Sequence, residues 1–243
     1  MTYRKILVPL DGSETAEQVL PFVREMAGPE TELVLFSVCP EDEQRLCRLN
    51  SVYLQVQAKA LAAEGVKALV HTEPGDLAGK IKEYVLREKV DLVAACRQAH
   101  SDLDREDKML RNLASKNCSL LLVKPGTVNP SIKRIILPLD GSMVSEEAIP
   151  FVAELGHVLK AEVVLLSVNA FPDIPSDRPP SARPSWDEYA LILMGEVRQQ
   201  ATAYLERAAE AFRNQGVKTR TLVVFGGAAE GILKASDEEK ADY

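Results

Sequence analysis

The chain has 243 residues, of which 46% are hydrophobic and 27% charged, so it can bury the core of one large or two small domains. Its formal net charge of −7 argues against a protein that coats nucleic acid, because binding to phosphates requires clustered Lys and Arg side chains. No apolar run approaches the roughly 18 residues of a membrane span, and the first residues do not resemble a signal peptide. We therefore expect a cytoplasmic protein with neither nucleic-acid nor membrane partners.

The first 125 residues alternate between apolar, strand-like runs and amphipathic, helix-like stretches. Strands are expected at residues 6–10, 33–38, 68–71, 91–95 and 120–123. Helices are expected after the Asp-Gly-Ser turn at 11–13 and at residues 41–63, 77–87 and 102–116. Such alternation predicts an α/β fold in which helices cover both faces of a parallel sheet.

The segment Ile6–Ser13 returns 129 residues later as Ile135–Ser142, and both copies end in Pro-Leu-Asp-Gly-Ser. A period this long indicates a repeated domain. The second copy continues with a helix at about 145–159, a strand at 163–168, a proline-rich loop at 172–184 and a helix to about 214. We predict a first domain at residues 1–125, a linker at 126–132 and a second domain at 133–243.

The second copy matches the first only as far as the fourth strand. Lys240-Ala241-Asp242 corresponds to Lys89-Val90-Asp91, where Asp91 opens strand four of the first copy. We therefore expect the second domain to lack strand four, its last helix and strand five, as a truncated product would.

The four cysteines show no metal-binding spacing, and neither do the three histidines, so no metal site is predicted. The cysteines are expected to be buried or reduced thiols. His71 and Cys96 are expected to end strands three and four, at the mouth of the first copy. There His71 would be a hydrogen-bonded wall residue rather than a general base, and a nearby helix N-terminus could lower the pKa of Cys96.

No catalytic residue is predicted. Ser13 and Ser142 lie in no G-x-S-x-G elbow, and no histidine recurs at equivalent positions of the two copies. Either Asp11 or Ser13 can cap the helix that follows the first turn. Asp11 and Asp140 have two compatible interpretations: each caps the following helix, and each bonds the adenine or ribose edge of a nucleotide.

Four segments together resemble the universal stress proteins in their tandem form: Pro-Leu-Asp-Gly-Ser after strand one, Pro-Phe-Val in the next helix, Asp-Leu-Val in strand four and Leu-Leu-Leu-Val-Lys-Pro at the end of the copy. The resemblance implies Rossmann-like domains of the adenine nucleotide alpha hydrolase type, with a five-stranded parallel sheet of order 3-2-1-4-5 and a ligand at the carboxyl ends of the strands. Members often bind ATP, and some do not. The positions implied for binding the adenosine are Pro9, Leu10, Asp11, Ser13 and Val38 in the first copy and Pro138, Leu139, Asp140, Ser142 and Val168 in the second.

The family holds the triphosphate with a Gly-x2-Gly-x9-Gly-Ser/Thr element after strand four. Here Cys96 and Ala99 replace the first two glycines, and no glycine occurs between Gly79 and Gly126. The loop carries four carboxylates instead, Asp102, Asp104, Glu106 and Asp107. Since two like charges about 4 Å apart repel by roughly 4 kcal/mol near a protein surface, we expect no ATP in the first domain. Without this element in the second copy, we expect no tight triphosphate binding by the chain.

The function predicted from this resemblance is a non-catalytic stress-response protein that acts as an interaction or regulatory module, with ATP or another adenine nucleotide as its ligand by analogy. The alternative is an adenine-nucleotide-dependent enzyme that hydrolyses ATP or adenylates a substrate. Adenylating relatives carry a Ser-Gly-Gly-x-Asp-Ser loop where this chain has Asp-Gly-Ser. Leu120–Val123 is expected to pair between chains in a homo-oligomer, and an unidentified protein partner is also expected.

Overall fold

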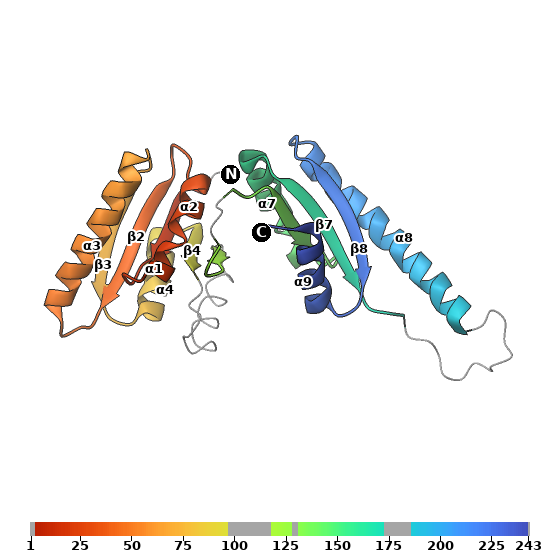
Figure 1. Cartoon of the computed structure of the whole chain (residues 1–243), viewed down its shortest axis with the longest axis horizontal. Coiled ribbons are helices and arrows are strands. Elements are labelled where there is room, and N and C mark those ends of the chain that lie inside the picture. Colours follow the sequence, from red (N-terminus) through yellow and green to blue (C-terminus); the bar gives the residue numbers. More distant parts are fainter. Residues whose placement is uncertain (1–2, 97–117, 128–130, 173–185, 243) are drawn as a thin grey trace. The chain divides into compact units, whose positions relative to one another are not determined.

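The computed structural model describes residues 3–96, 118–127, 131–172 and 186–242 (Figure 1). The chain divides into two compact units, Met1–Pro130 and Ser131–Tyr243. The helix expected at 102–116 and most of the proline-rich loop expected at 172–184 lie outside the described residues.

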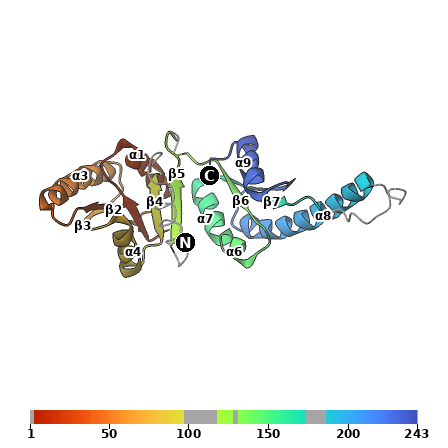
Figure 2. The same ribbon diagram turned by 90° about the horizontal axis from the view of Figure 1, so that it is seen from below.

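Unit 1 is a five-stranded parallel sheet of order β3-β2-β1-β4-β5, as predicted. Its elements are β1 (Lys5–Pro9), α1 (Glu14–Glu17), α2 (Leu20–Met26), β2 (Glu32–Cys39), α3 (Gln44–Ala63), β3 (Ala68–Pro74), α4 (Leu77–Glu88), β4 (Leu92–Cys96) and β5 (Ser119–Val123). Helices α3 and α4 lie on opposite faces of this sheet (Figure 2). The central strands are continuous apolar runs because both of their faces are covered.

The core beneath α4 illustrates this packing. Leu7, Val34 and Phe36 are fully buried there, against Ile81 and Tyr84 of the helix. Burying each such side chain contributes about 1.5–3 kcal/mol relative to leaving it exposed.

Unit 2 repeats the first part of this topology in a three-stranded parallel sheet of order β6-β7-β8. Its elements are β6 (Arg134–Pro138), α6 (Met143–Glu146), α7 (Ile149–Leu159), β7 (Glu162–Asn169), α8 (Trp186–Arg213), β8 (Thr219–Phe225) and α9 (Ala228–Glu239). Helix α9 takes the place of α4, and its buried Ala235 packs against Ile136, Val164 and Leu166. Within the ranges that the structure describes, no helix is both long and apolar enough to cross a membrane.

An aspartate holds the start of the first strand in both units. The Asp91 carboxylate accepts hydrogen bonds from the backbone N–H groups of Arg4 and Lys5, both at 2.9 Å. Asp242 does the same for Lys133 and for Arg134, the first residue of β6, at 2.8 and 2.9 Å. The sequence match between Asp91 and Asp242 therefore reflects a shared structural role.

Two expectations about the elements require correction. The single helix expected after the first strand is two helices in each unit, and the second begins with Pro21 in α2 and Pro150 in α7 at its first turn. Proline has no N–H to continue a preceding helix, but it is accommodated at the start of a new one. The third strand also runs beyond the expected 68–71, to Pro74.

Candidate nucleotide-site edge

The Asp-Gly-Ser turn of unit 1 follows β1 at the carboxyl edge of the sheet. Asp11 Oδ1 accepts hydrogen bonds from the backbone N–H and the hydroxyl of Ser13, at 2.9 and 2.6 Å. Ser13 Oγ in turn accepts from Ala16 N at 3.1 Å and is the N-cap of α1. Gly12 allows the turn because its φ is +87°. The expectation that Asp11 caps the helix is therefore wrong: Ser13 is the cap, and Asp11 holds Ser13.

Unit 2 reproduces this turn. Asp140 Oδ1 accepts from Ser142 N at 2.9 Å, and Ser142 Oγ accepts from Ser145 N at 3.2 Å. Hydrogen bonds from the hydroxyl and the backbone of Ser142 lower the pKa of Asp140 to about 2. Asp140 is exposed and ionised near neutral pH, and again Ser142 rather than the aspartate caps the helix.

The neighbouring strands bring the other predicted residues to the same edge, because β1 and β2 are adjacent and parallel, as are β6 and β7. Leu10 and Leu139 are buried, and their N–H groups donate to the carbonyls of Phe36 and Leu166, both at 2.8 Å. Pro9 and Pro138 are the last residues of their strands, and both retain some exposure. These four residues thus lie at the carboxyl ends of β1 and β6, where each strand pairs with its neighbour.

Val38 and Val168 lie near the carboxyl ends of β2 and β7, and their side chains pack against the apolar clusters beneath α4 and α9. The Val38 carbonyl accepts a hydrogen bond from Asn50 Nδ2 at 2.9 Å, and the same amide donates to Ser37 Oγ at 3.1 Å. Sequence reasoning missed Asn50, because its position in a helix gives no sign that it reaches the end of β2.

The expectation of four reduced or buried thiols is wrong for two of them. Cys39, the last residue of β2, forms a disulfide with Cys47 in α3, with Cα atoms 5.2 Å apart. The bond closes the short connection between β2 and α3 at the carboxyl edge. Unit 2 has Asn169 and Arg198 at the corresponding positions, so the disulfide belongs to unit 1 alone.

Cys96 ends β4, as expected. Its environment differs from the expectation, because burial raises the pKa of this thiol instead of a helix N-terminus lowering it. Cys96 is therefore neutral near neutral pH and contributes no charge to the edge.

His71 does not end its strand. It lies in the middle of β3, where its ring stacks on Phe36 and contacts Tyr84, with centroids 5.6 and 4.8 Å apart. Its Nε2 lies 2.7 Å from Glu73 Oε1, which also accepts from Arg87 at 3.0 Å. Burial alone would raise the pKa of Glu73, but these hydrogen bonds hold it below its ordinary value. His71 is thus part of the packing under α4, away from the mouth.

The model of the universal stress protein family matches residues 2–106 and 131–243. The match spans most of the chain, in two copies, so the chain belongs to the universal stress protein family and is a stress-response protein with tandem domains. No curated protein matches the chain significantly.

Solved structures of similar proteins share this fold. A universal stress protein from Archaeoglobus fulgidus DSM 4304 is 16% identical, with a TM-score of 0.70 over 98% of this chain and 82% of that one. A protein of unknown function from Pseudomonas aeruginosa PAO1 is 18% identical, with a TM-score of 0.67 over 98% and 79%. At such identities the likeness shows the fold alone.

Proposed function

We propose that this chain is a non-catalytic regulatory member of its family, which acts by binding a partner, and that its first unit does not hold ATP in the family manner. The observation that carries the proposal is the residue at the end of β4. There the chain supplies Cys96, a half-buried and neutral thiol, instead of a glycine whose bare backbone approaches a phosphate.

The nucleoside end of this edge supports the same proposal. The Asp11 carboxylate already holds the N–H and hydroxyl of Ser13, and the Val38 carbonyl already accepts from Asn50. An adenosine would have to displace or share these bonds. The edge therefore offers little net gain to a nucleotide.

We further propose that copies of the chain pair through β5. Among the strands that the structure describes, β5 pairs only with β4, so its other side is an edge. Leu122 on this strand is 41% exposed, and an unpaired strand edge is a template for pairing with another chain. Pairing with a second β5 would satisfy the edge and cover this side chain.

Native mass spectrometry of the freshly purified chain, with and without ATP and magnesium, tests the nucleotide part. We expect no stoichiometric nucleotide, and a mass increase of one ATP that disappears with Asp11→Ala would overturn the proposal. A phosphate-release assay tests the enzymatic alternative, for which sustained turnover of ATP is the required result.

Light scattering tests the pairing through β5. We expect a dimer for the natural chain and a monomer for Leu122→Lys, because a charged side chain blocks edge-to-edge association. Leu86→Lys is the matched control, since Leu86 is 62% exposed on α4 and away from the strand edge. A monomeric natural chain would contradict the proposal.

A further inference from the structure

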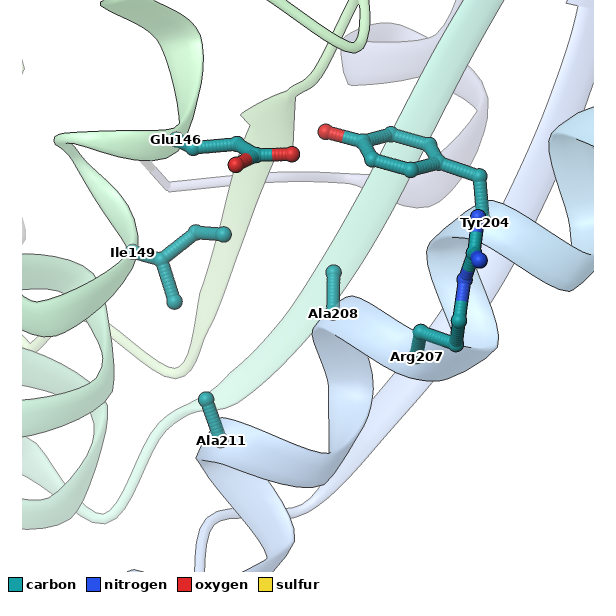
Figure 3. A pocket seen from close by; sticks show the side chains of 6 residues that line it. All are labelled: Glu146, Ile149, Tyr204, Arg207, Ala208 and Ala211. Atoms are coloured by element: carbon teal, nitrogen blue, oxygen red, sulfur yellow. The ribbon is translucent and has the colours of Figure 1, made fainter. Parts of the chain in front are cut away.

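A groove of about 350 Å³ lies in unit 2, between the α6–α7 segment and α8 (Figure 3). None of the residues that line the groove belongs to the Asp-Gly-Ser turn at 140–142. Its lining combines a carboxylate, a phenol and a guanidinium with three apolar side chains: Glu146, Tyr204, Arg207, Ile149, Ala208 and Ala211. Its volume is at the lower end of the range for small-molecule sites.

Unit 1 has a polar network at the equivalent positions. Glu17 corresponds to Glu146, at the 129-residue offset of the Asp-Gly-Ser turns, and Tyr53 corresponds to Tyr204, at the 151-residue offset of Gly65 and Gly216. In unit 1, Glu17 Oε1 accepts from the Tyr53 hydroxyl at 2.8 Å and from the Gln57 amide at 2.9 Å. One carboxylate oxygen thus holds two donors that reach it from α3.

Unit 2 keeps the acid and the phenol but lacks the amide. Ala208 replaces Gln57, and Arg207 replaces Val56. Alanine at position 208 lacks the N–H donor that would lie against Glu146, and arginine at position 207 adds a cation at the rim of the groove. Arg207 is exposed and forms no ion pair within the part of the chain that the structure describes.

The Tyr204 hydroxyl differs from its counterpart in unit 1. Its oxygen is buried, yet it makes no hydrogen bond to any described residue, whereas the Tyr53 hydroxyl is bonded. Figure 3 shows it pointing across the groove toward Glu146. Burial raises the pKa of Tyr204, and so does the Glu146 carboxylate that faces it, so the phenol is protonated. A buried polar group without a partner is rare in folded proteins and indicates a missing one.

We propose that this groove binds a small molecule of the amino-acid type, with a primary amide at one end and a carboxylate at the other. The N–H donor takes the place of the Gln57 amide on Glu146, and an acceptor on the same group receives the Tyr204 hydroxyl. The carboxylate reaches Arg207 at the rim, where a guanidinium matches its geometry. The aliphatic stem lies against Ile149, Ala208 and Ala211. This proposal is independent of whether unit 1 binds a nucleotide.

L-Glutamine is the probe, because its side chain reproduces the missing amide. Titration of the ¹⁵N-labelled full chain is expected to shift the backbone resonances of residues 143–149 and 204–211 to saturation. Ala208→Gln rebuilds the unit 1 arrangement and is expected to weaken binding about tenfold or more, a loss of roughly 1.4 kcal/mol or more. Because Gln occupies the equivalent position of α3, this variant has a folded precedent within the same chain.

Transplantation is the converse experiment. The double variant Val56→Arg with Gln57→Ala gives unit 1 the residues of the groove and is expected to add a second glutamine site, with shifts near Glu17 and Tyr53. Val52→Ala, at another exposed position of α3, is the matched control and adds no site. The proposal is overturned if L-glutamine causes no saturating shifts, or if Ala208→Gln leaves its affinity unchanged.

Discussion

The two units keep the same backbone devices and differ in the side chains that the helices bring together. Both use an Asp-Gly-Ser turn with serine as the helix cap, and both tie the first strand to an aspartate that follows the fourth helix of the repeat. Only unit 1 has the disulfide at the end of its second strand and the amide that closes on Glu17. The contacts that build the sheet are therefore retained, while those beside it have diverged.

This difference is physical in origin. The turn and clamp residues fix the ends of the first strand in the sheet, whereas Gln57 and Cys47 make contacts beside the sheet. Loss of such a local contact leaves the fold intact and changes the surface. The comparison implies that effects on stability should be largest for the shared core and smaller for features of one unit.

The largest effect is expected in the core. Phe36→Ala removes a fully buried ring that stacks on His71 and contacts the tilted ring of Tyr84, and it should lower the stability of unit 1 by about 3–5 kcal/mol. Hydrogen exchange followed by mass spectrometry resolves the two units. Exchange should rise within residues 3–96 and stay unchanged within 131–242, and an equal rise in both would show that the units unfold as one.

Leu166→Ala is the matched variant, because Leu166 is the fully buried counterpart of Phe36 in unit 2. It should reverse the pattern, with about 2–5 kcal/mol lost from unit 2. Together the two variants measure how independent the units are.

Reduction of the Cys39–Cys47 disulfide comes next. The two cysteines are eight residues apart in the sequence. For a loop of this length, the loss of chain entropy in the unfolded state stabilises the fold by roughly 2–3 kcal/mol. A reducing agent should therefore speed hydrogen exchange in β2 and α3 and leave unit 2 unaffected. Cys39→Ser should abolish the response, and full alkylation of both thiols in the untreated native protein would contradict the prediction.

A smaller loss is expected at the aspartate clamps. Asp91→Ala leaves the N–H groups of Arg4 and Lys5 without their acceptor, which should cost about 1–3 kcal/mol in unit 1. Asp242→Ala should cost a similar amount in unit 2, because its bonds have the same geometry. Denaturant unfolding of each variant measures both, and a neutral Asp242→Ala would show that this clamp matters only in the larger sheet.

The strands were predicted well because runs such as Ile6–Leu10 are short, continuous and apolar, as buried parallel strands are. The sheet order came from the resemblance to the universal stress proteins, and the structure confirms it. Sequence reasoning failed where a contact joins distant segments at one point. Nothing in the periodicity of α3 indicates that Cys47 lies over the end of β2, or that Tyr53 reaches Glu17. The end of β3 was missed because this edge strand is only half-buried and continues through polar residues to Pro74. Alignment of the two copies would have found Glu17 and Tyr53, since both recur at the repeat offsets.

The smallest effect is a change of pKa at the turn of unit 2. Asp140 titrates at about 2, chiefly because the Ser142 hydroxyl donates to it. Ser142→Ala should raise this pKa toward the ordinary value of 3.8, although the backbone N–H at position 142 still donates. Ser142→Thr keeps the hydroxyl and should leave the pKa low. Carboxyl ¹³C NMR during an acid titration distinguishes the two variants.

The sign of the linked stability follows from the direction of that shift. A carboxyl whose pKa is lower in the folded chain stabilises it above the unfolded pKa, and the contribution disappears as the pH falls through the folded value. For Asp140 the window lies between the ordinary 3.8 and about 2. Because this carboxylate is fully exposed, the titration should be visible by NMR while the stability of unit 2 changes little over the same range. A pKa that stayed at 2 in Ser142→Ala would instead assign the shift to the backbone of the turn, the part of the structure that both units share.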